Sequence, residues 1–204
     1  MNILHIDCST RRSSHSRQLS AAIVERLSAT ADTVTVTRRD LGSNPVPHVE
    51  ADYANTLATA AAIMGANAFV FRRSDPLIDE LEIADMVVIG TPMHNFTVPS
   101  SLKAWIDQIL RVGRTILTGP EGKLGSLADR PVFIAVASGG VYSGEGANQP
   151  DFLTPYITAA LGCIGLTSLH FAALQATAFT NEEVLASRRR SLAKEAGTAN
   201  IKSG

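Results

Sequence analysis

The first twenty residues, MNILHIDCSTRRSSHSRQLS (1–20), join a short apolar run to a turn that is rich in hydroxyl and basic side chains. Residues 3–8 predict a strand buried on both faces, because apolar residues dominate them. The turn that follows holds no glycine, which argues against the glycine-rich fingerprint of dinucleotide-binding folds. Apolar residues then recur at helical spacing over 14–29, so a helix begins within the hydroxyl cluster. Hydroxyl and N–H groups at a helix N-terminus can surround one phosphate.

The alternation of strand and helix continues along the rest of the chain. Further strands are predicted at 33–37, 86–90, 132–137 and 168–177, and further helices at 51–71, 76–84, 100–109, 151–164 and 182–196. Such alternation predicts right-handed crossovers and a parallel sheet covered on both faces. Because no repeat or linker divides the sequence, we expect residues 1–204 to form one doubly wound, five-stranded α/β domain.

Composition excludes several classes of protein. The 204 residues carry a formal net charge of -1, which gives no nucleic-acid footprint. Cys8 and Cys163 cannot build a disulfide framework, and no ligand spacing indicates a metal site. The first apolar run ends at Asp7 and no run is long enough to span a membrane, so we expect a cytoplasmic protein.

Three loops are candidate binding segments, because ligands of open α/β sheets lie beyond the carboxyl ends of the strands. The first is the hydroxyl-rich turn, and the third is the glycine turn SGG (138–140) after the fourth strand. Between them, TPMHNFTVP (91–99) holds Met93 and Phe96 in a turn braced by prolines, which favours a platform for a flat ligand. Each loop taken alone could equally be an ordinary solvated or packed turn. Their coincidence at one edge of the sheet favours a site.

Four segments together carry a resemblance to a known family: CSTRRSSHSRQLS (8–20), GTPMHNFTVPSSLKAWIDQILRVGRT (90–115), SGG (138–140) and TPYITAALGCIGL (154–166). They resemble the FMN-dependent NADH-azoreductases, a group of flavodoxin-like quinone reductases. The resemblance implies a flavodoxin-like fold with strand order 2-1-3-4-5, noncovalent FMN and a homodimer. It also implies hydride transfer from NADH or NADPH through FMN to quinones and azo compounds, in ping-pong turnover.

The resemblance also implies which residues bind FMN. The phosphate would be held by Ser9, Ser14, His15 and Ser16. The isoalloxazine ring would be held by Pro92, Met93, His94, Asn95 and Phe96. The pyrimidine edge of that ring would be held by Ser138, Gly139 and Gly140. No catalytic side chain is implied, because FMN carries the hydride. His94 stands where the family usually has tyrosine, and we expect it to orient ligands. The competing interpretation makes it a proton donor, since imidazole titrates near neutral pH.

Two other functions remain open on the sequence. A flavodoxin-type electron carrier would use the same fold, but such carriers usually have a strongly acidic surface, and this chain is nearly neutral. A flavodoxin-like regulatory protein without a cofactor would not need the intact hydroxyl-rich turn. We therefore expect an enzyme whose partners are NAD(P)H and small aromatic acceptors, with no role in binding nucleic acid or membrane.

Overall fold

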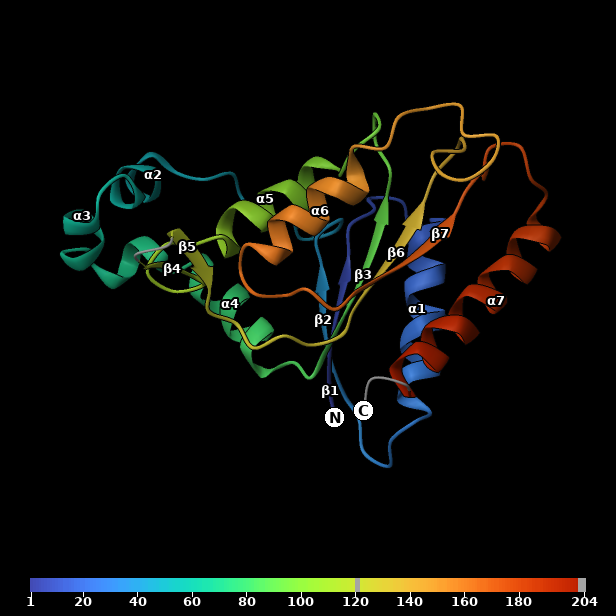
Figure 1. Ribbon diagram of the computed structural model, residues 1–204, viewed down its shortest axis with the longest axis horizontal. Coiled ribbons are helices and arrows are strands. Elements are labelled where there is room, and N and C mark those ends of the chain that lie inside the picture. The colour runs from blue at the N-terminus through green and yellow to red at the C-terminus, as the bar shows by residue number, and fades with distance from the viewer. Residues whose placement is uncertain (120–121, 202–204) are drawn as a thin grey trace.

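Five parallel strands form the central sheet of the computed structural model, which describes residues 1–119 and 122–201. The strands are β1 (Asn2–Asp7), β2 (Thr35–Asp40), β3 (Met86–Pro92), β6 (Val132–Ala137) and β7 (Leu169–Leu174). They lie in the order β2-β1-β3-β6-β7, and every neighbouring pair is parallel (Figure 1). Numbered within this sheet alone the order is 2-1-3-4-5, so the predicted flavodoxin-like topology is confirmed.

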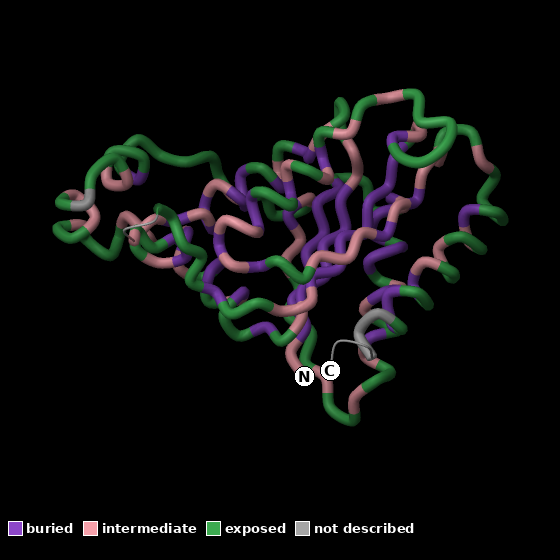
Figure 2. The backbone as a smooth tube through the Cα atoms, viewed as in Figure 1, coloured by how far each residue is buried: buried purple, intermediate pink, exposed green. Residues whose placement is uncertain are grey.

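Helices cover both faces of the sheet, and each face has its own apolar core. Helices α1 (His15–Ser28) and α7 (Glu182–Ile201) pack on one face. The opposite face is covered by α4 (Ser74–Ile83), α5 (Ser100–Ile109) and α6 (Leu153–Gly162). Figure 2 shows that the buried residues concentrate in the central strands and in the helix faces turned toward them. The carboxyl ends of these rigid strands therefore give the connecting loops fixed starting points.

The Ala-rich segment over 51–71 is not the single helix that its composition predicts, so that prediction was wrong. It folds as α2 (Ala51–Leu57), α3 (Ala60–Met64) and the 3₁₀ helix η1 (Ala68–Phe71). Thr59 and Asn67 interrupt the helix, because their side chains accept hydrogen bonds from the backbone N–H groups of Ala62 and Phe69. Side chains of this kind compete with the helical ladder and start a new turn.

The connection between α5 and β6 contains a hairpin that the sequence did not reveal. Strands β4 (Ile116–Gly119) and β5 (Gly122–Gly125) pair antiparallel in a separate two-stranded sheet. Each strand has only four residues, too few to show a clear period in the sequence. Gly125 is required at its position, because a Cβ there would lie 2.1 Å from the backbone nitrogen of Gly165. Figure 1 places the hairpin with α2 and α3 at one end of the molecule, away from the carboxyl edge of the sheet.

Other predicted boundaries differ from the observed ones by a few residues. Strand β2 runs over Thr35–Asp40 rather than 33–37, and β7 ends at Leu174. No helix in the described ranges, 1–119 and 122–201, is long and apolar enough to cross a membrane.

Candidate functional site

One pocket of about 260 Å³ lies at the carboxyl edge of the sheet and brings the three predicted loops together. Its lining residues are Arg11, Ser14, His15, Ser16, Pro92, Met93, His94, Ala137, Gly139, Thr177 and Ala178. The pocket lies beyond strands β1 and β3, where the strand order reverses and where open α/β sheets bind ligands. The contribution of Thr177 and Ala178, from a fourth loop after β7, was not predicted.

The hydroxyl end of the pocket is the N-terminus of α1. Ser14 is the N-cap residue: its hydroxyl accepts a hydrogen bond from Arg17 N–H at 3.3 Å and lies 3.0 Å from the Ser16 hydroxyl. Within the described part of the chain, the N–H groups of His15 and Ser16 donate to no acceptor. The first turn of α1 carries no acidic residue, although helices commonly place one there. Free N–H groups, buried hydroxyls and the adjacent Arg11 make this end suited to an anion.

Ser9, by contrast, lies behind the pocket rather than in it. Its side chain is buried and accepts a hydrogen bond from Arg11 N–H at 3.2 Å. Its carbonyl oxygen accepts two hydrogen bonds from Arg17, from Nε at 2.9 Å and from Nη2 at 2.6 Å. Ser9 therefore shapes the turn, and in this structure it does not face the pocket that Ser14, His15 and Ser16 line.

Arg17 is the residue that sequence reasoning missed at this end. It is buried, and besides Ser9 its guanidinium donates to Asp40 at 2.9 Å and to Asp7 at 3.3 Å. Asp40 ends β2 and pairs in register with Asp7 at the end of β1. One side chain thus ties the turn after β1 to the ends of two strands. The only signal in the sequence was an arginine in the first turn of a helix, where the dipole disfavours a cation.

Both carboxylates that face Arg17 are held in the ionised form. Burial raises the pKa of Asp7, but hydrogen bonds with His5, Arg38 and Ser20 outweigh burial and bring the pKa below its ordinary value. The hydrogen bond from Arg17 lowers the pKa of Asp40 well below its usual range. Arg17 is therefore paired with carboxylates, and the unpaired positive charge at the turn comes from its exposed arginines, Arg11 and Arg12.

The loop after β3 forms the opposite wall of the pocket. His94 and Thr97 close it through two backbone hydrogen bonds, at 2.9 and 3.0 Å. Between them, Asn95 and Phe96 have φ angles of 47° and 71°, in the left-handed region that non-glycine residues seldom adopt. Strain of this kind persists where the surrounding structure imposes it, often at a binding site. Met93 and His94 line the pocket, while Asn95 and Phe96, which follow them in the loop, are exposed and do not line it.

The glycine turn after β6 supplies free backbone donors. Within the described residues, the N–H groups of Gly139 and Gly140 donate to no acceptor, and Gly139 lines the pocket. Gln149 braces this wall from behind: its Nε2 donates to the buried Ser138 hydroxyl at 2.9 Å and lies 3.2 Å from the Met93 sulfur. A Cβ at Gly140 would lie 2.7 Å from Gln149 Oε1, so a larger residue there would displace the Gln149 side chain. Gln149 was not predicted from the sequence.

Other reactive groups in the described part of the chain do not form a second catalytic centre. Burial raises the pKa of the Cys8 thiol far above its ordinary value, so the thiol stays protonated and unreactive. His5 is buried, with Nε2 2.9 Å from the Ser20 hydroxyl. In residues 1–119 and 122–201, no group of three or more His, Cys, Asp and Glu side chains could hold a metal ion.

Comparison with known proteins shows the family of this chain. The Flavodoxin_2 family model, described as a flavodoxin-like fold, matches residues 1–196. FMN-dependent NADH:quinone oxidoreductase 4 of Pseudomonas fluorescens is 47% identical over 186 residues, covering 91% of this chain and 89% of the relative. The chain belongs to this oxidoreductase family. Oxidoreductase 5 of Burkholderia lata is 44% identical over 181 residues, covering 87% of this chain and 86% of the relative.

Solved structures extend the family likeness to the fold. An azoreductase from Bacillus anthracis superposes with a TM-score of 0.84 at 25% identity, over 97% of this chain and 99% of that chain. A second protein of that organism, an FMN-dependent NADH-azoreductase in complex with FMN, superposes with a TM-score of 0.81, over 97% of each chain. At 21% identity this second likeness shows the fold alone. The resemblance drawn from the sequence motifs is confirmed at the level of family and fold.

Proposed function

We propose that this oxidoreductase binds FMN and passes hydride from NADH or NADPH to quinones and azo compounds. The observation that carries the proposal is the single pocket in which an anion-binding helix terminus faces the strained loop after β3 and the glycine turn after β6. Relatives at 44–47% identity are named FMN-dependent NADH:quinone oxidoreductases. The structural neighbours include azoreductases.

The residues present fit the parts of FMN. A phosphate monoester needs several donors, and the N-terminus of α1 offers the unpaired N–H groups of His15 and Ser16 beside two buried hydroxyls. A flat ring needs an apolar wall, which Pro92 and Met93 provide. The polar edge of the ring needs donors, which the free N–H groups of the 138–140 turn supply. Bound FMN would supply the hydride chemistry, and the protein would supply position and electrostatics.

The chain's own residues act on charge and orientation. Backbone N–H groups of Gly139 and Gly140 are fixed by the strand end, so they stabilise negative charge at the ring edge without reorganising. His94 is exposed at the pocket mouth, where it contacts whatever enters. We assign it an orienting role, because the reduced oxygens of a quinone can take protons from water. The dinucleotide and the acceptor would occupy this pocket in succession, as in ping-pong turnover.

A second copy of the chain would complete this pocket in a homodimer. Phe96 and Phe152 are 44% and 60% exposed, and the Phe152 N–H donates to the Phe96 carbonyl at 3.0 Å. Exposed aromatic side chains on two segments joined by a backbone hydrogen bond are typical of an interaction surface. Sedimentation velocity tests the assembly: the FMN-loaded protein should sediment as a dimer, and a fully active monomer at assay concentration would refute it. The cytoplasmic location and the single-domain organisation stay predictions.

Spectroscopy of the purified protein tests the central proposal. FMN should bind with a perturbed flavin absorbance, NADH should bleach it without oxygen, and a quinone should restore it. Ser14→Ala and Ser16→Ala should each weaken FMN binding by about 1–3 kcal/mol while leaving riboflavin binding nearly unchanged. A protein that binds no FMN would instead be a flavodoxin-like regulator. One that binds FMN but reacts only with one-electron partners would be an electron carrier.

The same half-reactions test the role of His94. His94→Ala should leave flavin reduction by NADH unchanged and should alter the preference among quinones. Loss of a general acid costs a hundredfold or more in rate, as an order of magnitude. A drop of that size confined to reoxidation, with loss of its pH dependence, would show that His94 donates a proton.

A further inference from the structure

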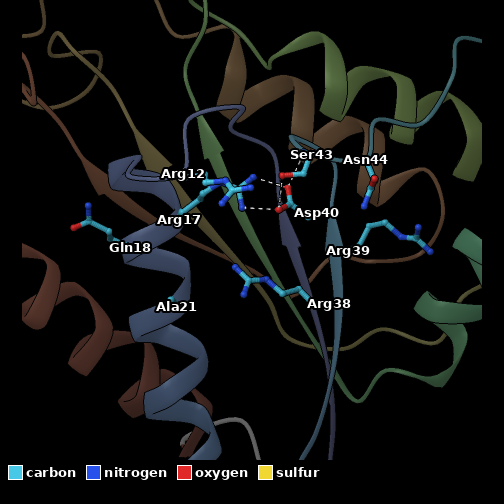
Figure 3. A pocket seen from close by; sticks show the side chains of 9 residues that line it. All are labelled: Arg12, Arg17, Gln18, Ala21, Arg38, Arg39, Asp40, Ser43 and Asn44. Atoms are coloured by element: carbon cyan, nitrogen blue, oxygen red, sulfur yellow. Dashed lines mark hydrogen bonds and ion pairs between the residues drawn. The ribbon is translucent and has the colours of Figure 1, made fainter.

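A second hollow, of about 610 Å³, lies on the other side of the hydroxyl-rich turn from the pocket described above. It is bounded by the turn after β1, the first turns of α1 and the end of β2 (Figure 3). Four arginines line it against a single lining carboxylate, Asp40. None of the residues predicted from the sequence to bind FMN lines this hollow, and the proposed flavin chemistry does not use it.

The four arginines differ in how many donors they have free and in where their side chains point. Arg17 is buried and fully engaged by Ser9, Asp7 and Asp40. Arg39 pairs through two nitrogens with Glu80 of α4, and Figure 3 shows its side chain directed away from α1. Asp40 accepts from Arg17 and from Ser43, so it has little capacity to pair with another arginine.

Arg12 and Arg38 are the two that remain. The Arg38 side chain is 59% exposed and gives only Nη2 to Asp7, at 2.7 Å, leaving Nε and Nη1 without an acceptor in the described residues. Arg12 is exposed, and its guanidinium makes no hydrogen bond or ion pair within that same part of the chain. Figure 3 shows Arg38 reaching from β2 toward α1 and Arg12 placed above it beside Arg17. Two open guanidinium groups thus reach the same hollow from opposite walls.

The position of Arg12 connects the hollow with the pocket. Arg11 lines the pocket and its chain neighbour Arg12 lines the hollow, so the turn after β1 is the wall between the two spaces. A ligand that lies in the pocket at one end and carries phosphates at the other would pass both arginines. Guanidinium groups bind phosphate oxygens with paired, charge-assisted hydrogen bonds.

We propose that Arg12 and Arg38 form the site for the adenosine diphosphate half of the nicotinamide dinucleotide, whose nicotinamide end enters the pocket. This inference rests on the proposed function, because it assigns the dinucleotide a path beyond the pocket. In this arrangement, residues at the end of β2 contribute to dinucleotide affinity, and hydride transfer takes place beside the end of β3. The hollow then sets how tightly the donor binds and leaves the choice of acceptor to the loop after β3.

Anaerobic stopped-flow reduction of the FMN-loaded protein tests the assignment. Arg12→Gln and Arg38→Gln should each raise the dissociation constant for NADH by about tenfold, with weaker dependence on salt. The limiting rate of flavin reduction and the affinity for FMN should stay unchanged. Arg26→Gln is the matched control, since it makes the same charge change on an exposed position at the far end of α1. NADH affinity that is equal in all three variants and the unmodified protein would overturn the proposal.

Calorimetry with ADP-ribose separates this inference from the proposed function. ADP-ribose carries the diphosphate but no nicotinamide, so it should bind the flavin-free protein and lose affinity in both hollow variants. If the protein takes up no FMN yet binds ADP-ribose through Arg12 and Arg38, the proposed function is wrong and the assignment of the hollow is supported. If FMN binds and ADP-ribose affinity ignores both substitutions, the proposed function stands and the assignment of the hollow is wrong.

Discussion

Replacing Arg17 with glutamine removes the cation that joins the turn after β1 to the ends of two strands. The change deletes two hydrogen bonds to the Ser9 carbonyl, at 2.6 and 2.9 Å, and the ion pairs with Asp40 and Asp7. Asp7 is 0% exposed, so its charge cannot turn to water. Breaking one partner of a buried pair costs about 3–5 kcal/mol. Because Arg38 still contacts Asp7, we expect the low end, about 3 kcal/mol of the free energy of unfolding.

Urea unfolding of the flavin-free protein, followed by far-ultraviolet circular dichroism, measures this loss. Arg38→Gln is the comparison, because that side chain is 59% exposed and gives Asp7 one hydrogen bond, so its removal should cost less than the removal of Arg17. Arg17→Lys keeps the positive charge but lacks the forked guanidinium that reaches Ser9 and Asp40 together. Its loss of stability should therefore lie between those of Arg38→Gln and Arg17→Gln. FMN affinity should drop for Arg17→Gln more than riboflavin affinity does. A stability loss for Arg17→Gln no larger than for Arg38→Gln would refute the reasoning.

Three other changes test the surroundings of the site. Gly42→Ala would place a Cβ 2.0 Å from the Ser9 carbonyl oxygen, so the turn must move; overpacking of this kind costs about 1–3 kcal/mol, and a thermal midpoint equal to wild type would contradict it. Folding lowers the pKa of Asp40, so its ionised carboxylate stabilises the protein above about pH 4, and this stabilisation is lost as the pH falls through the lower pKa of the folded state. In Asp40→Asn, the free energy of unfolding should therefore fall less steeply as the pH is lowered below about 4. Asn95→Gly should relieve a φ of 47° and raise the free energy of unfolding by up to about 1 kcal/mol, whereas a clear loss in urea unfolding would show that the Asn95 side chain stabilises the loop.

The fold was predictable where burial is complete on both faces. Strands β1, β3 and β6 appear in the sequence as nearly continuous apolar runs, and the residues 132–137 are all buried in the structure. The edge strand β2 was placed less accurately, because its exposed residues carry no burial signal and only their β-branched side chains mark it. The three candidate loops followed from the rule that strand ends position ligands, and all three line the pocket.

The supports of the site were not predictable, because they depend on register and on long-range contacts. Asp7 and Asp40 are 33 positions apart and meet only through the pairing of β1 with β2, which then gives Arg17 two acceptors at once. Gln149 reaches Ser138 and Met93 from a loop with no regular structure. The helix predicted over 51–71 failed because two polar side chains cap new turns, an effect that composition alone does not show.

The two ends of the pocket are built by different means, and this difference bears on function. The phosphate end stands on the buried Arg17, whose ion pairs with Asp7 and Asp40 tie it to two strand ends, so substitutions of Arg17 should change cofactor affinity and stability together. The opposite wall consists of an exposed loop closed by its own backbone, with Asn95 and Phe96 outside the core. Substitutions in that loop cost little packing energy and change the surface that substrates contact. We therefore expect substitutions at residues 94–96 to change acceptor preference at little cost in stability, while Arg17 and Asp40 tolerate little change.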